Sequence, residues 1–244
     1  MISSFAAELM THVVLDAVAE RGRCLLALSG GGTPAPLYRL MAASPYFETL
    51  PWGHMFFFWG DERCVPRDNP ESCYQQALDA WLGHVPVMPF NIFRPRGELG
   101  PKVAASNYAR QLKSMAEPGL AWPRFDFVLL GMGMDGHTAS LFPGSAETSG
   151  LATVAVSANY QDRPAKRVSL TPDVFNAARN VVFLVSGPEK ASALAATLAG
   201  PRQPLNLPAQ RIHPQDGHLY WLVDQPAASQ LPEKTEGVNL QHHH

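Results

Sequence analysis

The sequence predicts an α/β fold in which a mainly parallel sheet is covered by helices on both faces. Short apolar runs of the kind that buried strands show alternate with helical patterns of about ten residues. This alternation is typical of βαβ units, whose crossover helices lie on the two faces of a parallel sheet. The 244-residue chain is 46% hydrophobic and 16% charged, so it has enough apolar residues for the core of one large domain.

The first third of the chain predicts helix, strand, helix and strand. Apolar residues recur at helical spacing over residues 6–20, and a serine before them is a candidate N-cap. Cys24–Leu28 is a short apolar run that ends in Ser-Gly-Gly-Gly, which indicates a buried strand and a sharp turn. Residues 34–42 form the next expected helix, with proline in its first turn. Met55–Trp59 is a second buried strand.

The same alternation continues to the end of the chain. Asn69 and Pro70 give a cap followed by proline, which predicts a helix through residue 81. Residues 102–115 are strongly helical, and residues 125–130 form the most apolar strand, interrupted only by Asp126. The other expected elements are a short strand at Ile92, strands over 153–156, 167–170, 181–185 and 219–223, and an alanine-rich helix over 188–198.

Domain organisation and location follow from composition. We expect residues 1–231 to form a single α/β domain, with room for a smaller lobe from the middle third, and residues 232–244 to be a polar, tag-like C-terminal tail. A net charge of −2 argues against a nucleic-acid or membrane-surface partner. No apolar run approaches the roughly 18 residues of a membrane span, and the N-terminus lacks a secretion signal. We therefore expect a cytoplasmic protein.

The chain has three cysteines, Cys24, Cys64 and Cys73. A small, odd number of cysteines does not indicate a disulfide framework. No CxxC spacing offers a zinc site. We therefore expect reduced thiols, no metal and no cofactor.

The first loop of chemical interest follows the first strand. Its glycines expose successive N–H groups, and its hydroxyls add donors, in the segment Ser29, Gly30, Gly31, Gly32 and Thr33. The helix that begins after Thr33 adds a partial positive charge. The segment is a candidate cradle for a phosphate monoester, although no Walker or Gly-x-Gly-x-x-Gly pattern is present. A tight turn without a ligand remains the alternative.

The second loop places three charges directly after a buried strand, at Asp61, Glu62 and Arg63. The planar guanidinium of Arg63 suits a phosphate group, and Asp61 or Glu62 could orient it. The alternative is a solvated loop with an internal ion pair.

The third loop, residues 131–143, follows the most apolar strand. Gly133 and Gly136 bracket Asp135, and His137 opens what we expect to be a short helix. An imidazole can take and return a proton near neutral pH, and Asp135 is close enough in sequence to steer the ring. A histidine that only caps the helix is the alternative.

Two cations lie near later strands and could neutralise part of a phosphate's charge. Arg167 opens the run Arg-Val-Ser-Leu-Thr, and Lys190 follows the strand over 181–185. Ordinary surface cations are the alternative for both.

Taken in order, these segments resemble a known family over about residues 4–231. They are similar to the 6-phosphogluconolactonases of the glucosamine-6-phosphate isomerase/6-phosphogluconolactonase family. The segments that carry the resemblance are SGGGTP, GDERCVP, GMGMDGHTASLFPGS, RVSLT with VSGPEKA, and LPAQRI with WLVDQPAAS. The resemblance implies a Rossmann-like α/β fold shared with sugar-phosphate deaminases and isomerases. It also implies hydrolysis of 6-phospho-D-glucono-1,5-lactone to 6-phospho-D-gluconate, the second step of the oxidative pentose phosphate pathway, by a monomer or a homodimer.

Two other functions stay open. A deaminase of glucosamine 6-phosphate typically has Asp-Glu-Tyr where this chain has Asp-Glu-Arg at 61–63, and Ala-Phe-Asn-Glu where this chain has residues 138–143. A non-catalytic sugar-phosphate sensor would keep the pocket and lose the chemistry. The chain departs from the lactonase pattern in two places: Met134 stands where proline is common, and residues 162–166 contain fewer prolines than usual. These departures weaken the assignment of Arg167 to phosphate binding.

The chemistry of a lactone fits these residues. A δ-lactone is an activated ester, so neither a metal nor a covalent intermediate is required. His137 would remove a proton from the attacking water and return it to the departing ring oxygen, while Asp135 holds the ring. Backbone N–H groups of the glycine-rich loops would stabilise the oxyanion. Arg63, the 29–33 loop, Lys190 and Arg167 would anchor the phosphate.

Overall fold

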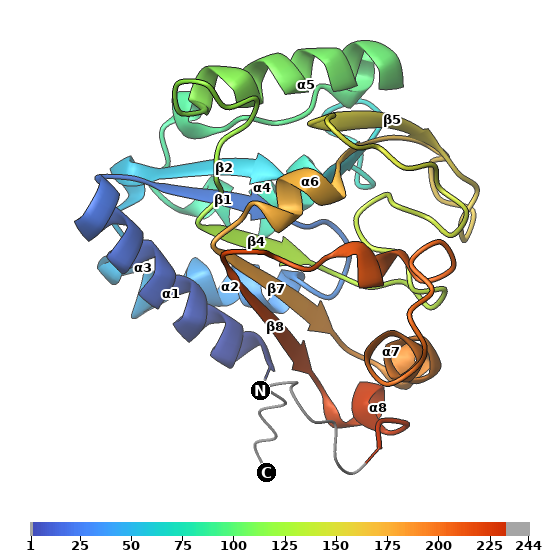
Figure 1. Cartoon of the computed structure of the whole chain (residues 1–244). Coiled ribbons are helices and arrows are strands. Elements are labelled where there is room, and N and C mark those ends of the chain that lie inside the picture. Colours follow the sequence, from blue (N-terminus) through green and yellow to red (C-terminus); the bar gives the residue numbers. More distant parts are fainter. Residues whose placement is uncertain (1, 233–244) are drawn as a thin grey trace.

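The structure, a computed structural model, describes residues 2–232, so the tail expected from residue 233 onward lies outside it. Its main element is a five-stranded sheet with the order β2-β1-β4-β7-β8 (Figure 1). The strands are β1 (Cys24–Leu28), β2 (Met55–Trp59), β4 (Phe127–Leu130), β7 (Asn180–Val185) and β8 (His218–Val223). Every neighbouring pair is parallel. The predicted α/β class with a mainly parallel sheet is confirmed.

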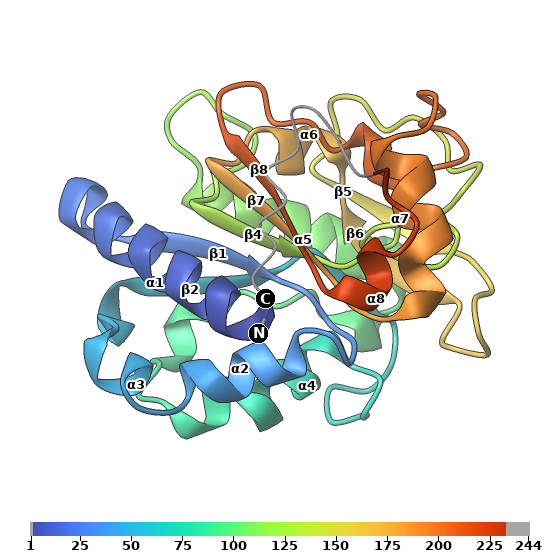
Figure 2. The ribbon, with the colours of Figure 1, turned by 90° about the horizontal axis from the view of Figure 1, so that it is seen from below.

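Helices cover both faces of this sheet (Figures 1 and 2). The first face carries α1 (Ile2–Arg21), α2 (Ala35–Met41) and α4 (Cys73–Ala80). The second carries α5 (Pro101–Met115), α6 (Pro172–Asn176), α7 (Ala191–Leu198) and α8 (Gln225–Ala228). Side chains alternate along β1, so that Leu26 and Leu28 join the core on the first face while Leu25 and Ala27 join the core on the second. A further short helix, α3 (Tyr46–Thr49), follows α2.

A second, three-stranded sheet is antiparallel, with the order β3-β6-β5. Its strands are β3 (Asp61–Arg63), β5 (Thr153–Ser157) and β6 (Lys166–Leu170). The expected strands over 153–156 and 167–170 therefore exist but do not extend the parallel sheet. The connection between them turns back on itself, where the Arg163 N–H donates to the Tyr160 carbonyl at 3.1 Å, and it is too short for a crossover helix. Residues 61–63 were expected as a loop and are a strand.

Several helix boundaries differ from the sequence expectation. The helix expected from residue 69 begins at Cys73, because the Gln75 N–H donates to the Ser72 hydroxyl at 3.2 Å. Asn69 lies in the turn that precedes this helix, where its carbonyl accepts from the Ser72 N–H at 2.8 Å. Ile92 makes an isolated bridge to Phe57 instead of a strand, and residues 188–190 form a 3₁₀ turn ahead of α7.

The helix expected directly after His137 is absent from the structure. Thr138 forms an isolated antiparallel bridge with Leu141, which turns the chain sharply. Ala139 at the centre of this turn has a φ of 49°, which no α-helix tolerates. His137 is therefore held by a loop and not by the first turn of a helix.

Helix α1 corrects the expectation that no segment could span a membrane. Within residues 2–232 it is the one helix that is long and apolar enough to do so by length and composition. A helix packed in the core of a protein meets the same criterion. The side chains of α1 that are buried against the sheet are Ala6, Ala7, Met10, Val13, Val14 and Ala17.

The strand order places a crevice between β1 and β4. From β1 the chain crosses to β2 on one side, and it later returns to β4 on the other side of β1. The loops that follow these two strands therefore separate at the carboxyl edge of the sheet, where open α/β sheets bind ligands. These are the first and third loops that the sequence singled out.

Candidate active site

A pocket at this edge brings most of the predicted site residues together. Those that line it are Ser29, Gly30, Gly31, Gly32, Thr33, Asp61, Arg63, Gly133, His137, Arg167 and Lys190. Asp135 and Gly136 do not line it. The pocket therefore unites all three loops with the two later cations, as expected if they serve one ligand.

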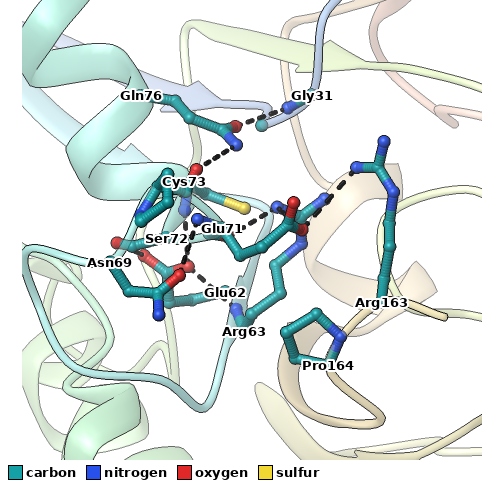
Figure 3. A network of polar contacts seen from close by, with 12 residues as sticks. Gly31, Glu62, Arg63, Asn69, Glu71, Ser72, Cys73, Gln76, Arg163 and Pro164 are labelled. Carbon is teal, nitrogen blue, oxygen red and sulfur yellow. Dashed lines mark hydrogen bonds and ion pairs between the residues drawn. The ribbon is translucent and has the colours of Figure 1, made fainter.

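The glycine-rich loop after β1 is held from behind by two helices. The Tyr38 hydroxyl of α2 donates to the Ser29 carbonyl at 2.6 Å, and the Gly31 N–H donates to Gln76 Oε1 of α4 at 2.8 Å (Figure 3). Gly30 is required here, because a Cβ would lie 2.3 Å from the sulfur of Cys73. The N–H groups of Gly32 and Thr33 donate to no residue between 2 and 232, which leaves them free for a ligand.

Strand β3 sends alternate side chains in opposite directions. Glu62 points away from the pocket and accepts from the N–H groups of Cys73 at 2.6 Å and Tyr74 at 2.9 Å, at the start of α4 (Figure 3). Burial raises the pKa of Glu62 despite these hydrogen bonds. Asp61 points toward the pocket and accepts from the Ser140 hydroxyl at 2.6 Å. Glu62 thus fixes the helix and does not orient the Arg63 side chain.

The two buried arginines of the second sheet keep unused hydrogen-bond donors. Arg63 Nη1 donates to the Glu71 carbonyl at 2.7 Å, and Arg167 Nε donates to the Pro164 carbonyl at 3.0 Å. Arg63 Nε and Arg167 Nη2 are buried without a hydrogen-bond partner. Burial lowers the pKa of Arg167, and the nearby Arg63 lowers it further. Buried donors of this kind fit an anionic ligand, since a buried group is costly when it is left unpaired.

Lys190 adds a further cation at the pocket. Burial lowers the pKa of its ammonium group, and Arg163 lowers it further, while Glu189 and Asp135 oppose this. An ammonium that is partly desolvated and lies near another cation favours a ligand with negative charge.

His137 and Asp135 are in direct contact. Asp135 Oδ1 lies 2.6 Å from His137 Nδ1 and also accepts from the His137 backbone N–H at 3.1 Å. Burial opposes ionisation of Asp135, but its hydrogen bonds with His137 outweigh this and lower the pKa of the carboxyl group. The ionised carboxylate accepts the Nδ1 proton, so Nε2 carries the free lone pair. Nε2 makes no hydrogen bond with residues 2–232.

The glycines around this pair have structural roles. A Cβ on Gly133 would lie 2.0 Å from His137 Nδ1 and 2.6 Å from Asp135 Oδ1, so only glycine leaves room for the contact. The Gly133 N–H donates to the His137 carbonyl at 2.8 Å and is not free for a ligand. Gly136 has a φ of 78° and packs against Leu207, outside the pocket.

Comparisons with known proteins identify the family of the chain. The sequence profile described as glucosamine-6-phosphate isomerases/6-phosphogluconolactonase matches residues 1–221. The chain belongs to this family. A 6-phosphogluconolactonase of Synechocystis sp. is 41% identical over 225 residues, which are 91% of this chain and 90% of that protein. The structure of 6-phosphogluconolactonase from Trypanosoma brucei superposes with a TM-score of 0.82 at 27% identity and covers 95% of both chains.

A deaminase has the same fold. A monomeric glucosamine-6-phosphate deaminase superposes with a TM-score of 0.80 at 24% identity, over 94% of this chain and 95% of that one. Such a likeness shows the shared fold alone, so the side chains of the pocket must distinguish the activities. The resemblance to 6-phosphogluconolactonases stated from the motifs is confirmed.

Outside the loops that the sequence singled out, sequence reasoning missed three pocket residues. Tyr160, Gln161 and Arg163 lie on the turn between β5 and β6 and reach over the pocket. The Tyr160 ring packs edge-on against the His137 ring at 4.6 Å between centroids. Arg163 Nη1 lies 3.9 Å from the Glu71 carboxylate, which is also 3.8 Å from Arg63 Nη1 (Figure 3). Asp162 and Pro164 favour a turn here, but no feature of the sequence indicates that this turn lies at the pocket, and Gln161 has a positive φ without being glycine.

Proposed function

We propose that this chain hydrolyses 6-phospho-D-glucono-1,5-lactone to 6-phospho-D-gluconate. The observation that carries the proposal is that one pocket combines groups suited to bind a phosphate with a group suited to transfer a proton. Buried, unsatisfied guanidinium nitrogens of Arg63 and Arg167 favour a phosphate, and the free Nε2 of His137 favours proton transfer. A phosphorylated lactone uses both, and the relatives named 6-phosphogluconolactonase support the same substrate.

The phosphate of the substrate would be held by cations and backbone donors. Arg63, Arg167 and Lys190 supply positive charge, and the free N–H groups of Gly32 and Thr33 supply hydrogen bonds. Arg163 adds a cation that the sequence did not suggest. These contacts act on a part of the substrate that does not react, so their binding energy serves to orient the lactone carbonyl.

The hydrolytic step would depend on His137. Its Nε2 takes a proton from water as the water oxygen attacks the lactone carbonyl carbon. The C–O bond of the ring then breaks, and the imidazolium returns the proton to the departing ring oxygen. Asp135 keeps the Nδ1 proton in place and stabilises the imidazolium while it exists. The step needs no metal or cofactor, because the lactone is already an activated ester.

We infer a cytoplasmic enzyme whose partner is the small sugar-phosphate lactone, with neither nucleic acid nor membrane involved. Its assembly would be a monomer or a homodimer.

A coupled assay tests the proposed activity. Fresh lactone is mixed with excess 6-phosphogluconate dehydrogenase, and NADPH formation is followed with and without this protein. We expect a rate well above spontaneous lactone hydrolysis. A rate equal to the spontaneous one would overturn the proposal, and ammonia release from glucosamine 6-phosphate would favour the deaminase instead.

A further inference from the structure

A second cavity lies at the opposite edge of the sheet, where strands β1, β4 and β7 begin. Residues that line it are Arg21, Arg23, Leu25, Met115, Glu117, Pro123, Arg124, Asp126 and Arg179. None of them lines the candidate active site. The four arginines come from three segments of the chain: Arg21 and Arg23 from the end of α1 and its connection to β1, and the other two from the stretches that precede β4 and β7. Their convergence on one cavity is therefore a product of the fold.

The cavity carries more positive than negative charge. Four arginines face two acidic residues, Glu117 and Asp126, and Arg21 also pairs with the neighbouring Glu20, which leaves one positive charge in excess in a chain whose net charge is −2. Glu117 is exposed, so solvent screens its charge. Asp126 is buried, and its Oδ2 accepts from the Leu25 N–H at 2.8 Å.

Asp126 neutralises part of the cluster. Its Oδ1 lies 3.1 Å from Arg21 Nη2 and 3.7 Å from Arg179 Nε, so these two guanidinium groups flank one carboxylate oxygen. Asp126 makes no such pair with Arg23 or Arg124. The charge in excess therefore belongs to these two arginines.

The arginines are positioned by neutral acceptors. Arg124 Nε donates to the Ala177 carbonyl at 3.1 Å, and Arg124 Nη2 donates to the Asp216 carbonyl. Arg179 Nη1 in turn donates to the Arg124 carbonyl at 3.4 Å. Carbonyl groups fix a guanidinium without cancelling its charge. Arg23 makes no hydrogen bond or ion pair with residues 2–232, so its five N–H donors are available.

Positive charge is crowded at this cavity. Burial lowers the pKa of Arg179, and Arg21 and Arg124 lower it further, while Asp126 opposes this. Guanidinium groups that are held close to one another and are partly desolvated repel one another unless an anion lies between them. A bound anion would relieve the repulsion and use the remaining donors.

We propose that this cavity is a second anion-binding site, and that it takes inorganic phosphate or the phosphate group of a small metabolite. Guanidinium groups that converge from several directions suit a tetrahedral dianion, whose oxygens radiate from one centre, better than a linear dicarboxylate. The site is independent of the proposed lactonase activity. Because β1 and β4 run from this cavity to the loops of the active site, the same two strands connect the two sites.

Isothermal titration calorimetry with inorganic phosphate tests the site. We expect two binding events on the wild-type protein, one at each pocket. Arg23→Gln should weaken one event about tenfold or more, as for the loss of a charge-assisted hydrogen bond, and leave the other unchanged. Arg23→Glu should abolish that event. Arg39→Gln, at an exposed arginine outside both cavities, is the matched control and should change neither event.

A second background separates the two pockets. In the double variant Arg63→Gln/Arg167→Gln the active-site event should be lost, and the remaining event should still depend on Arg23. Thermal melting of each variant checks that it is folded. A single binding event on the wild-type protein, or equal affinities for Arg23→Gln and Arg39→Gln, would overturn the proposal. The titration is then repeated with glycerol 3-phosphate, a phosphate monoester. Tighter binding of inorganic phosphate would indicate a site for free phosphate, and tighter binding of glycerol 3-phosphate would indicate a site for a phosphorylated metabolite.

Discussion

Arg63 on β3 and Arg167 on β6 are directly paired in register across the antiparallel second sheet. Both side chains are buried, and both line the candidate active site. Like charges directly opposite each other destabilise an antiparallel pair. Asp61 favours the charge on both arginines and offsets part of this cost, and a bound phosphate would offset more of it, which is a common relation between stability and binding in functional sites.

The variant Arg167→Gln tests this relation. It should raise KM about 10- to 100-fold, as expected for the loss of a hydrogen bond to a charged group, and change kcat much less. The free energy of unfolding should stay equal or rise, because one of the two opposed charges is removed. Steady-state kinetics and urea unfolding measure the two effects. An unchanged KM would remove Arg167 from the phosphate site.

The contact between His137 and Asp135 leads to a second prediction. His137→Gln should lower kcat by about 10²- to 10⁴-fold, the usual contribution of a general base. Asp135→Asn should lower kcat less, since the imidazole remains but loses the acceptor that holds its Nδ1 proton. Both are measured on fresh lactone with correction for spontaneous hydrolysis. Near wild-type turnover in His137→Gln would contradict the assignment of the base.

Gly133 offers a test that leaves every polar group in place. In Gly133→Ala the new Cβ would lie 2.0 Å from His137 Nδ1, so the imidazole must move away from Asp135. We expect a fall in kcat of about 10²-fold, comparable to the loss of a positioned catalytic group, with the fold retained. Gly53→Ala is the matched control, because nothing lies within 4 Å of its Cβ. Equal activity of the two variants would show that the contact is not needed.

Much of the parallel sheet could be predicted from the sequence, for a physical reason. Strands buried on both faces, such as Met55–Trp59, are continuous apolar runs that stand out against amphipathic helices. The loops over 29–33 and 131–137 were found because ligands collect where parallel strands end. Both loops line the pocket.

The second sheet could not be predicted in the same way. β3 has only three residues, all charged, and its strand conformation comes from pairing with β6. The turn that carries Tyr160 and Arg163 at the pocket has positive φ at Gln161 and Asp162, and glutamine is a residue type that rarely adopts this conformation. Tertiary contacts, not local propensity, decide these segments.

Tyr160 has a role that can be separated from its hydroxyl group. Its ring packs edge-on against His137, while its oxygen only accepts from the Met134 N–H at 3.4 Å. Tyr160→Phe should keep nearly full kcat, and Tyr160→Ala should lower it about tenfold, because an aromatic contact of about 0.5–1.5 kcal/mol no longer restrains the imidazole. The comparison is made by steady-state kinetics. Equal losses in the two variants would assign the role to the hydroxyl group instead.

Glu98 provides a prediction on pH, in the segment packed behind Arg63. Hydrogen bonds from Arg94, at 2.8 Å and 2.9 Å, lower the pKa of Glu98 from 4.5 to about 2. A lowered pKa in the folded state means that the pair stabilises the protein above pH 4.5 and that this contribution is lost as the pH falls toward 2. Because the pair is partly exposed, we expect less than about 1 kcal/mol.

This pH dependence can be measured by urea unfolding of the wild-type protein and Glu98→Gln between pH 6 and pH 3. The wild-type protein should be more stable at pH 6, and the difference should shrink as the pH falls below 4.5, because Glu98 then takes up a proton in the unfolded chain while it stays ionised in the folded protein. Arg94→Gln should reproduce the effect from the other side of the pair. Gly97, the residue before Glu98, packs so closely against the Arg63 carbonyl that it has no room for a Cβ. Loss of the Arg94–Glu98 pair in either variant should therefore disturb Arg63 and also raise KM for the phosphorylated substrate. A difference in stability that is constant with pH would show that Glu98 acts through its packing and not through its charge.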